Sequence, residues 1–333
     1  MPASPRSWVV RQFGDPAHAL SLETVEPRTP NHGEVRVAVD AVGLNFPDLL
    51  VCAGRYQERP EPPFSPGFEA AGTVVATGPG SQFMDGQRVI VVPELPDGAL
   101  QTSLTVPDAQ LYPVPDSMPA SVAGTLHIAY QTAHLALHHR GGLRRGEWVL
   151  VTGASGGVGS AAVQLAKAAG GRVIALATGS GKANACRMFG ADVVIDLAAE
   201  PEPDPVEAIR ATTGGRGVDL IVDAVGGPLL DRIRRAIAFE GRLVIVGFAA
   251  GEITALPANH VLLRNYAVLG LHLARYRREN PALLRDVHEQ LVRLWREGAI
   301  APQIHRELPF DEALDGLAMV AGREAVGRVV LLT

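Results

Sequence analysis

The chain has 333 residues, of which 47% are hydrophobic and 20% are charged, and its formal net charge at pH 7 is -5. This length predicts two domains, and the composition is typical of a globular protein. The weak negative charge argues against nucleic acid or an anionic membrane surface as a partner. No uninterrupted apolar run reaches the ~18 residues that a membrane span requires. We therefore expect neither a nucleic-acid nor a membrane partner.

Roughly the first 120 residues predict a strand-rich domain. Short β-type runs at Glu34–Val42, Gly72–Thr77 and Arg88–Val92 are separated by loops that contain Gly and Pro. Such a pattern is typical of a barrel or a sandwich.

The middle of the chain alternates between strands and helices. The expected strands are Trp148–Thr152, Arg172–Ala177, Asp192–Leu197, Val218–Ala224 and Arg242–Phe248. The expected helices are Val158–Ala169, Lys182–Phe189, Pro205–Thr212 and Leu229–Ala238. Continuous apolar strands between amphipathic helices indicate βαβ units, and hence an α/β fold with a doubly wound parallel sheet that is buried on both faces.

The last part of the chain is too short to form a domain of its own. Its expected elements are a sixth strand, a long helix, a short helix and a last strand, at Tyr266–Leu273, Pro281–Glu297, Asp311–Ala321 and Arg328–Leu332. We expect this tail to pack back on the N-terminal domain. The predicted organisation is thus an α/β domain at residues 123–265, inserted in a domain made of residues 1–122 and 266–333.

Two cysteines, Cys52 and Cys186, are present in the whole chain. They supply neither a disulfide framework nor the paired spacing of a metal site. The N-terminal residues also lack the charged and apolar regions of a signal peptide. A cytoplasmic, reducing compartment is therefore expected. We interpret Cys52 as a small apolar packing residue, because a reactive thiol requires a nearby cation or helix N-terminus.

The segment Gly-Ala-Ser-Gly-Gly-Val-Gly follows the first strand of the parallel sheet and opens a helix. Gly156 lets the backbone approach a pyrophosphate, and Gly159 lets the helix pack against the strand, while the N–H groups of the first turn face the anion. The alternative is a Gly-rich turn without a ligand. The residues that we expect to contact a dinucleotide here are Ala154, Ser155, Gly156, Gly157, Val158 and Gly159.

The end of the second strand indicates which dinucleotide is bound. An NAD site typically carries an acidic residue there, which accepts a hydrogen bond from the ribose 2'-hydroxyl. This chain instead has Thr178, Ser180 and Lys182, separated by glycines. Small hydroxylated residues and a cation suit a 2'-phosphate. The prediction is therefore NADPH, although the alternative for Lys182 is an ordinary solvated helix residue.

Two further glycine-containing turns follow the fourth and fifth strands. Ligands of doubly wound sheets bind at the carboxyl ends of the strands, so these turns are expected to border the ribose and the nicotinamide. The alternative is ordinary turn chemistry. The residues concerned are Val225, Gly226, Gly247, Phe248 and Ala249.

The combination resembles the medium-chain dehydrogenase/reductase superfamily, and within it the zinc-free quinone oxidoreductases of the zeta-crystallin type. The resemblance extends over nearly the whole chain. It implies a Rossmann domain inserted in a GroES-like, β-rich catalytic domain, and commonly a homodimer, with the strand at Tyr266–Leu273 pairing with its copy. The matching segments are VGLNFPDLLVCAGRY, PGFEAAGTVVATG, AYQTAHLAL, VLVTGASGGVGSAAVQLAKA, FGADVVID and VGFAAGEI.

The resemblance also implies that no metal is bound. Zinc-dependent relatives carry a Cys-His pair and a Gly-His-Glu triplet in the N-terminal domain. The corresponding positions here are Asn45, Phe46 and Phe68, with only Glu69 kept, and Ile128 stands at a third ligand position. A catalytic zinc needs about three nitrogen, sulfur or oxygen ligands from the protein, which these side chains do not supply.

The candidate catalytic residues come from the N-terminal domain. The resemblance implies that the Asn45 amide faces the nicotinamide pocket and can hydrogen-bond a substrate carbonyl. Tyr56 matches a tyrosine that borders the substrate cleft, where it can donate a hydrogen bond or stack on a quinone ring; its alternative is a surface-loop tyrosine. Asp48 is expected to hold the loop or to cap a helix that begins there. Thr132 matches a threonine near the nicotinamide.

These observations predict an enzyme that reduces quinones with NADPH by hydride transfer from nicotinamide C4, without a metal. The substrate partner is then a small-molecule electron acceptor. Two alternatives remain at this point. One is an NADPH-dependent reductase of enoyl thioesters or enones, and the other is a protein that binds NADPH without turnover, since a fold alone does not specify a function.

Overall fold

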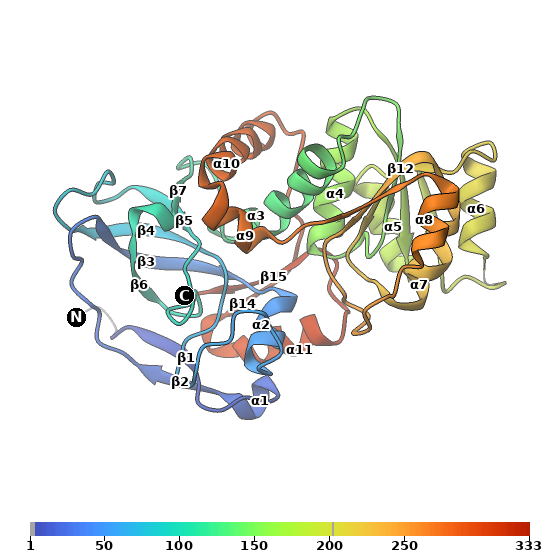
Figure 1. Ribbon diagram of the computed structural model, residues 1–333. Coiled ribbons are helices and arrows are strands. Elements are labelled where there is room, and N and C mark those ends of the chain that lie inside the picture. The colour runs from blue at the N-terminus through green and yellow to red at the C-terminus, as the bar shows by residue number, and fades with distance from the viewer. Residues whose placement is uncertain (1–3, 202) are drawn as a thin grey trace. The chain divides into compact units, whose positions relative to one another are not determined.

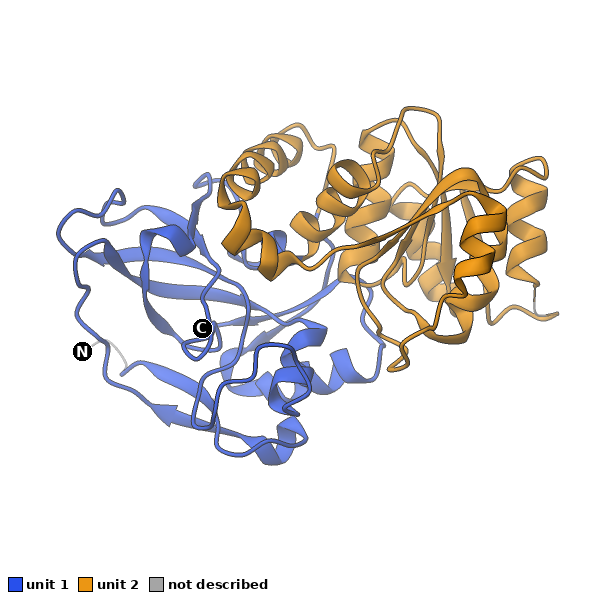
Figure 2. Ribbon diagram, in the orientation of Figure 1, with its two compact units in different colours: residues 1–128, 302–333 blue, residues 129–301 orange. Residues whose placement is uncertain are grey.

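Two units make up the described part of the chain, which is residues 4–201 and 203–333 of this computed structural model. The first unit consists of residues 1–128 and 302–333, and the second unit consists of residues 129–301 (Figure 2). The first three residues of the expected N-terminal domain lie outside the described range.

The chain returns to the first unit later than the sequence indicates. The expected return is at residue 266, whereas the second unit continues to residue 301. The reason is that β13 (Ala267–Gly270) pairs with the preceding strand of the parallel sheet, and α9 (Leu273–Glu279) and α10 (Pro281–Arg296) contact each other in the same unit. The tail that packs on the first unit is therefore only residues 302–333.

The first unit is built on a seven-stranded sheet with the order β14-β15-β3-β4-β5-β7, in which β6 also pairs with β3. Its central strand β3 alternates between core-facing and less buried positions, and Val35, Val37 and Val39 lie in the hydrophobic core. This is the strand-rich domain that the sequence predicts. Its elements in Figure 1 are β1 (Arg6–Val10), α1 (Pro16–Ala19), β2 (Leu20–Thr24), β3 (Glu34–Gly43), α2 (Phe46–Cys52), β4 (Ala70–Thr77), β5 (Arg88–Val91), β6 (Ser103–Pro107), η1 (Asp108–Gln110), β7 (Leu111–Pro113), β14 (Ile304–Pro309), η4 (Phe310–Glu312), α11 (Ala313–Ala321) and β15 (Arg328–Leu332).

The second unit contains a six-stranded parallel sheet with the order β10-β9-β8-β11-β12-β13. The sheet is the doubly wound one that the sequence predicts. Helix α3 (Ala120–His134) leads into this unit and continues as the π-helix η2 (Leu135–Arg140). The other elements are β8 (Trp148–Val151), α4 (Gly157–Ala168), β9 (Arg172–Ala177), α5 (Ser180–Met188), β10 (Val193–Asp196), α6 (Pro205–Thr212), β11 (Val218–Asp223), α7 (Gly227–Ile233), η3 (Arg234–Ala236), β12 (Ile237–Ile245) and α8 (Ala258–Arg264).

The order of the strands determines where a ligand can bind. The chain runs from β8 outward to β10, and then returns to β11 and continues outward to β13. Since parallel crossovers are right-handed, α4 and α5 cover one face of the sheet, and α7 and α8 cover the other. The direction reverses between β8 and β11, and ligands of such sheets bind at the carboxyl ends of the strands beside that point.

One expected helix is shorter than its sequence pattern indicates. The pattern at Leu229–Ala238 predicts a single helix, but α7 ends at Ile233, a short 3₁₀ turn follows, and β12 already begins at Ile237. Ile237 pairs with Val218 of β11. An apolar run of this length suits a helix or a buried strand equally, and the pairing in the sheet decides between them.

Within residues 4–201 and 203–333, every helix falls short of the length and hydropathy needed to cross a bilayer.

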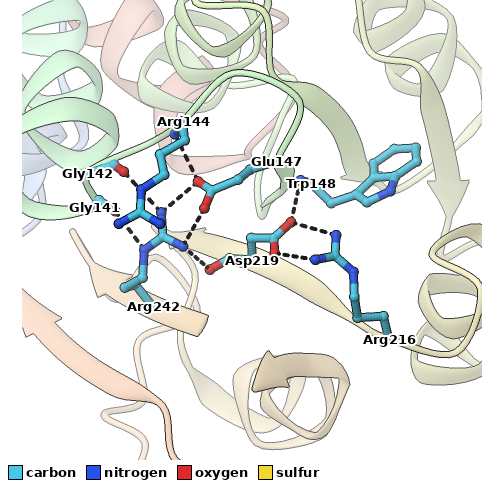
Figure 3. A network of polar contacts seen from close by, with 8 residues as sticks. All are labelled: Gly141, Gly142, Arg144, Glu147, Trp148, Arg216, Asp219 and Arg242. Carbon is cyan, nitrogen blue, oxygen red and sulfur yellow. Dashed lines mark hydrogen bonds and ion pairs between the residues drawn. The ribbon is translucent and has the colours of Figure 1, made fainter. Parts of the chain in front are cut away.

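A polar network joins the beginnings of the central strands (Figure 3). Arg242 of β12 donates to the Glu147 carboxylate at 2.7 Å and to the Asp219 carbonyl at 3.0 Å. The Asp219 carboxylate accepts the N–H of Trp148 at 2.7 Å and two hydrogen bonds from Arg216, at 3.0 and 3.1 Å. These contacts connect β8, β11 and β12 at the edge opposite the turns that the sequence assigns to a dinucleotide.

Replacement of Glu147 by glutamine is expected to lower the free energy of unfolding at pH 7 by roughly 1.5–3 kcal/mol, the usual contribution of hydrogen bonds to a charged group. Burial disfavours the charged carboxylate, but hydrogen bonds from Arg242 and from the Arg144 N–H outweigh it and hold the pKa of Glu147 below its usual value. A lowered pKa in the folded state stabilises the protein above the unfolded-state pKa, and this stabilisation is lost as the pH falls through the folded-state pKa.

Urea unfolding at several pH values tests this prediction. The difference between the wild type and Glu147→Gln should be largest near neutrality and should shrink below about pH 4.5, the ordinary pKa of the group. Glu207→Gln, at an exposed position of α6, is the matched control and should change the stability by less than about 0.5 kcal/mol. A difference that is constant between pH 3 and pH 7 would contradict the prediction.

Candidate functional site

The turn after β8 forms an open helix N-terminus. Gly156 is the N-cap residue of α4, and no side chain caps this helix. The first-turn N–H groups of α4 are therefore available to an anion at the carboxyl edge of the sheet. Gly153 adopts a φ of +55°, which reverses the chain between strand and helix. This arrangement fits a pyrophosphate, as the sequence predicts, and the contact itself remains a prediction.

Gly159 brings α4 close to the turn that precedes it. A Cβ at this position would overlap the Gly153 carbonyl oxygen and would lie 2.7 Å from the Cα of Ala154. Ala154 and Ser155 are buried under the helix, whereas Gly156 is half-buried. The segment that the sequence assigns to a dinucleotide is thus a compact turn, in which Gly159 is required by close packing.

Asp223 connects this turn to the turn after β11. Its side chain is fully buried and accepts a hydrogen bond from the Thr152 hydroxyl at 2.7 Å and one from the Gly226 N–H at 2.9 Å. The Thr152 oxygen in turn accepts the N–H of Ala224 at 3.0 Å. Burial raises the pKa of Asp223. Sequence reasoning missed this residue, although its signal was present as an acidic residue at the end of an apolar strand.

The turns after β11 and β12 are also hydrogen-bonded to each other. The N–H of Ala249 donates to the Ala224 carbonyl at 3.0 Å, and that of Ala250 donates to the Val225 carbonyl at 2.8 Å. A Cβ at Gly226 would lie 3.1 Å from the ring of Phe248. The structure therefore brings together the residues that the sequence expects to border the ribose and nicotinamide. Gly247 is half-buried, and Phe248 is exposed.

The turn after β9 leads into α5 and carries the predicted phosphate-binding residues. Gly179 is the N-cap residue, with a φ of +94°. Thr178 and Ser180 are exposed, and Lys182 is half-buried in the first turn of α5. The N–H of Gly179 donates to the carboxylate of Asp196 at 2.7 Å. Sequence reasoning missed this acidic residue because it belongs to the neighbouring strand, β10.

In the first unit, a buried cluster surrounds Asn45, which is 4% exposed. Arg328 donates to the Asn45 oxygen at 2.8 Å and to the Glu69 carboxylate at 2.6 Å. The Asn45 amide nitrogen donates to the Gly43 carbonyl at 3.0 Å and to Glu69 at 3.2 Å. Both the oxygen and the nitrogen of the Asn45 amide thus have partners. A substrate carbonyl would have to replace Gly43 or Glu69 as the acceptor of one amide hydrogen.

Asp48 lies in the same cluster, at the start of α2. Its side chain is fully buried and accepts the N–H of Asn45 at 2.6 Å, which fixes the beginning of the helix. Burial raises the pKa of Asp48 to about 7. Burial also raises the pKa of Glu69, against the opposing effect of Arg328 and of the Ile128 N–H. Two polar atoms of the cluster, Asp48 Oδ1 and Arg328 Nε, have no hydrogen-bond partner among the described residues.

The side chains of this cluster do not fit a catalytic zinc. Of the positions that hold ligands in zinc-dependent relatives, Asn45, Phe68 and Ile128 offer no imidazole or thiolate, and Glu69 is already paired with the Arg328 guanidinium. In the part of the chain that the structure describes, no group of three or more His, Cys, Asp or Glu side chains is arranged to hold a metal ion.

Three further residues considered in the sequence analysis are Tyr56, Cys52 and Thr132. The Tyr56 ring is half-buried in the first unit and lies edge-on to Phe68, with 5.2 Å between the ring centroids. Cys52 is fully buried, and burial raises the pKa of its thiol to about 12, which agrees with a packing role. Thr132 is 8% exposed on α3 and belongs to the second unit.

Known proteins share both units of this chain. A family model described as the alcohol dehydrogenase GroES-like domain matches residues 31–116, and one described as zinc-binding dehydrogenase matches residues 157–289. Quinone oxidoreductase-like protein 2 of Bos taurus is 36% identical over 315 residues, which cover 94% of this chain and 88% of the bovine protein.

Solved structures extend the likeness to the fold. A mycobacterial protein complexed with NADPH superposes with a TM-score of 0.90 at 29% identity, over 99% of this chain and 100% of that one. The CurK enoyl reductase superposes with a TM-score of 0.87 at 27% identity, over 99% of each chain. Since the likeness joins a GroES-like β unit to a Rossmann-type unit over almost the full length, the chain belongs to the quinone oxidoreductase-like proteins of the medium-chain dehydrogenase/reductase superfamily.

Proposed function

We propose that this protein is an NADPH-dependent, metal-independent reductase of quinones. The observation that carries the proposal is the edge of the parallel sheet, where an uncapped helix N-terminus adjoins a turn with two hydroxyl groups and a lysine. The names of the bovine relative and of the NADPH-bound mycobacterial structure support it. When bound, the cofactor supplies a hydride from C4 of its nicotinamide.

The residues of the second unit bind and orient the cofactor in this proposal. The first turn of α4 binds the pyrophosphate through its N–H groups, and Thr178, Ser180 and Lys182 bind the 2'-phosphate. The turns after β11 and β12, together with Thr132, border the nicotinamide ribose. Because Asp223 ties two of these turns to each other, they present a fixed surface, and a fixed orientation of the reactants is the main contribution that a protein makes to hydride transfer.

The residues of the first unit orient the acceptor. A quinone carbonyl is already electrophilic, so that it requires a hydrogen-bond donor and not a Lewis acid. The Tyr56 phenol can donate to it or stack on its ring. The Asn45 amide can donate to the quinone only if it gives up its hydrogen bond to Gly43 or the one to Glu69. The bond to Glu69 is the longer of the two, at 3.2 Å against 3.0 Å. Arg328 holds the side-chain oxygen of Asn45, and Asp48 holds its backbone N–H.

Initial rates of NADPH oxidation by the EDTA-treated protein test the proposed function, with an ortho-quinone and a short enoyl-CoA in parallel. A fast rate with the quinone alone supports the proposal. A fast rate with the enoyl-CoA instead favours an enoyl reductase, the second candidate, which the likeness to the CurK enoyl reductase supports. Tight NADPH binding without turnover of either acceptor would favour a protein that only binds the dinucleotide.

The Lys182→Glu variant is expected to bind NADPH about 10- to 150-fold more weakly and to bind NADH with little change. The expected factor corresponds to the ~1.5–3 kcal/mol of one charge-assisted hydrogen bond. Fluorescence titration with both dinucleotides measures it. Arg187→Glu, which makes the same charge change in the last turn of α5, is the matched control. An unchanged ratio of the two dissociation constants in Lys182→Glu would contradict the assignment of Lys182 to the phosphate.

A homodimer and a cytoplasmic location form part of the same proposal. β13 is the last strand in the order of its sheet, and Ala267, Val268 and Gly270 on it are exposed. An edge of this kind can pair with its copy across a two-fold axis. Sedimentation that shows a monomer alone would remove the dimer from the proposal. The location rests on the small number of cysteines in the sequence.

A further inference from the structure

A carboxylate from β10 lies beside the turn that carries the predicted phosphate-binding residues. β10 and β9 are parallel, and Asp196 is in register with Ala177, the last residue of β9. The Oδ1 atom of Asp196 accepts the N–H of Gly179 at 2.7 Å and the N–H of Ala198 at 3.0 Å. Asp196 therefore anchors the N-cap of α5, between Thr178 and the first turn of the helix.

The second carboxylate oxygen of Asp196 is not used in this anchoring. Oδ2 makes no hydrogen bond or ion pair to any residue in the described ranges, and the side chain is half-buried, not enclosed. An NAD site of this fold uses an acidic residue at the end of the second strand to accept the ribose 2'-hydroxyl. Here the acidic residue reaches the same turn from the end of the third strand.

We propose that Asp196 is a specificity-determining residue that acts against Lys182. This inference rests on the proposed binding of NADPH at the carboxyl edge of the sheet. The free oxygen of Asp196 accepts the ribose hydroxyl of NADH, and its negative charge repels the 2'-phosphate of NADPH. Lys182 in the first turn of α5 attracts that phosphate. The preference between the two cofactors is then the balance of two opposite charges on one turn, and not the effect of the lysine alone.

The variant Asp196→Asn separates charge from anchoring. Its side-chain oxygen can still accept the Gly179 N–H, while its nitrogen replaces the free carboxylate oxygen by a donor. We expect NADPH to bind about three- to tenfold more tightly and NADH to bind a few-fold more weakly, as is usual for a charge change a few ångströms from the ligand at partial exposure. In 0.5 M salt the gain for NADPH should shrink, because salt screens charges near the surface.

Two further variants test whether a change in cofactor affinity has a cause other than the charge of Asp196. Asp196→Ala removes the anchor together with the charge, and both dinucleotides should then bind more weakly. Asp192→Asn makes the same charge change just before β10, where the carboxylate pairs with Lys167 and accepts the Val173 N–H, and it should leave the ratio of the dissociation constants within about twofold of the wild type. Direct titration of all variants with NADPH and NADH requires no acceptor and no turnover.

The outcomes distinguish this inference from the proposed function. If the wild type binds neither dinucleotide, the proposed function itself fails. If the wild type binds both, and Asp196→Asn changes both affinities equally or not at all, Asp196 is only an anchor of the turn and the inference is overturned. If the ratio moves toward NADPH in Asp196→Asn and toward NADH in Lys182→Glu, the opposition of the two residues is established.

Discussion

Replacement of Arg328 by methionine is expected to lower the free energy of unfolding by about 3–5 kcal/mol, because it leaves a buried carboxylate without its charge partner. Arg328 and Glu69 are 6% and 0% exposed, and their side chains form an ion pair at 2.6 Å. The substitution also removes the hydrogen bond that the Asn45 oxygen accepts from Arg328 at 2.8 Å. Stability and the position of the Asn45 amide thus depend on the same guanidinium.

Urea unfolding of three variants measures this effect. Arg306→Met, at an exposed position of β14, is the matched control and should change the stability by less than about 0.5 kcal/mol. The double variant Arg328→Met with Glu69→Leu should be more stable than Arg328→Met alone, because it removes the unpaired charge together with its partner. A single variant as stable as the wild type, or a double variant less stable than the single one, would contradict the argument.

The sequence predicts the parallel sheet well because its inner strands, β8, β9 and β11, are buried on both faces. In β9, for example, the five residues from Val173 to Ala177 are all buried, and they form a continuous apolar run. The glycine-rich turn after β8 is also visible, since close packing at Gly159 permits no side chain. Patterns of this kind depend on neighbours a few residues apart, which a single sequence displays directly.

What the sequence does not show depends on contacts between distant segments. Arg328 meets Glu69 although 259 positions separate them, and no local pattern marks an arginine as buried. The sequence predicts a sixth strand near residue 266 but assigns the residues from 266 onward to the first unit, whereas residues up to 301 belong to the second unit. The same reason applies to Asp196: an acidic residue for the ribose is expected at the end of β9, whereas this carboxylate reaches that turn from β10.

The variant Gly159→Ala is expected to lower the free energy of unfolding by about 1–3 kcal/mol, the usual cost of an added methyl group in a packed interior. The methyl group would overlap the Gly153 carbonyl oxygen and would lie 2.7 Å from the Cα of Ala154. Both neighbours are backbone atoms, so that the strain can be relieved only by moving α4 away from the turn. NADPH should consequently bind at least tenfold more weakly, because the first-turn N–H groups move with the helix.

Unfolding and NADPH titration of the same variant test both parts of this prediction. Gly181→Ala is the control for unfolding, because nothing lies within 4 Å of a Cβ there, and a helical Gly→Ala change is neutral or stabilising by up to about 1 kcal/mol. If Gly159→Ala loses stability but keeps its NADPH affinity, α4 can move without disturbing the ligand, and the pyrophosphate does not depend on its N–H groups. If it loses neither, the close packing of α4 on the turn does not constrain the fold.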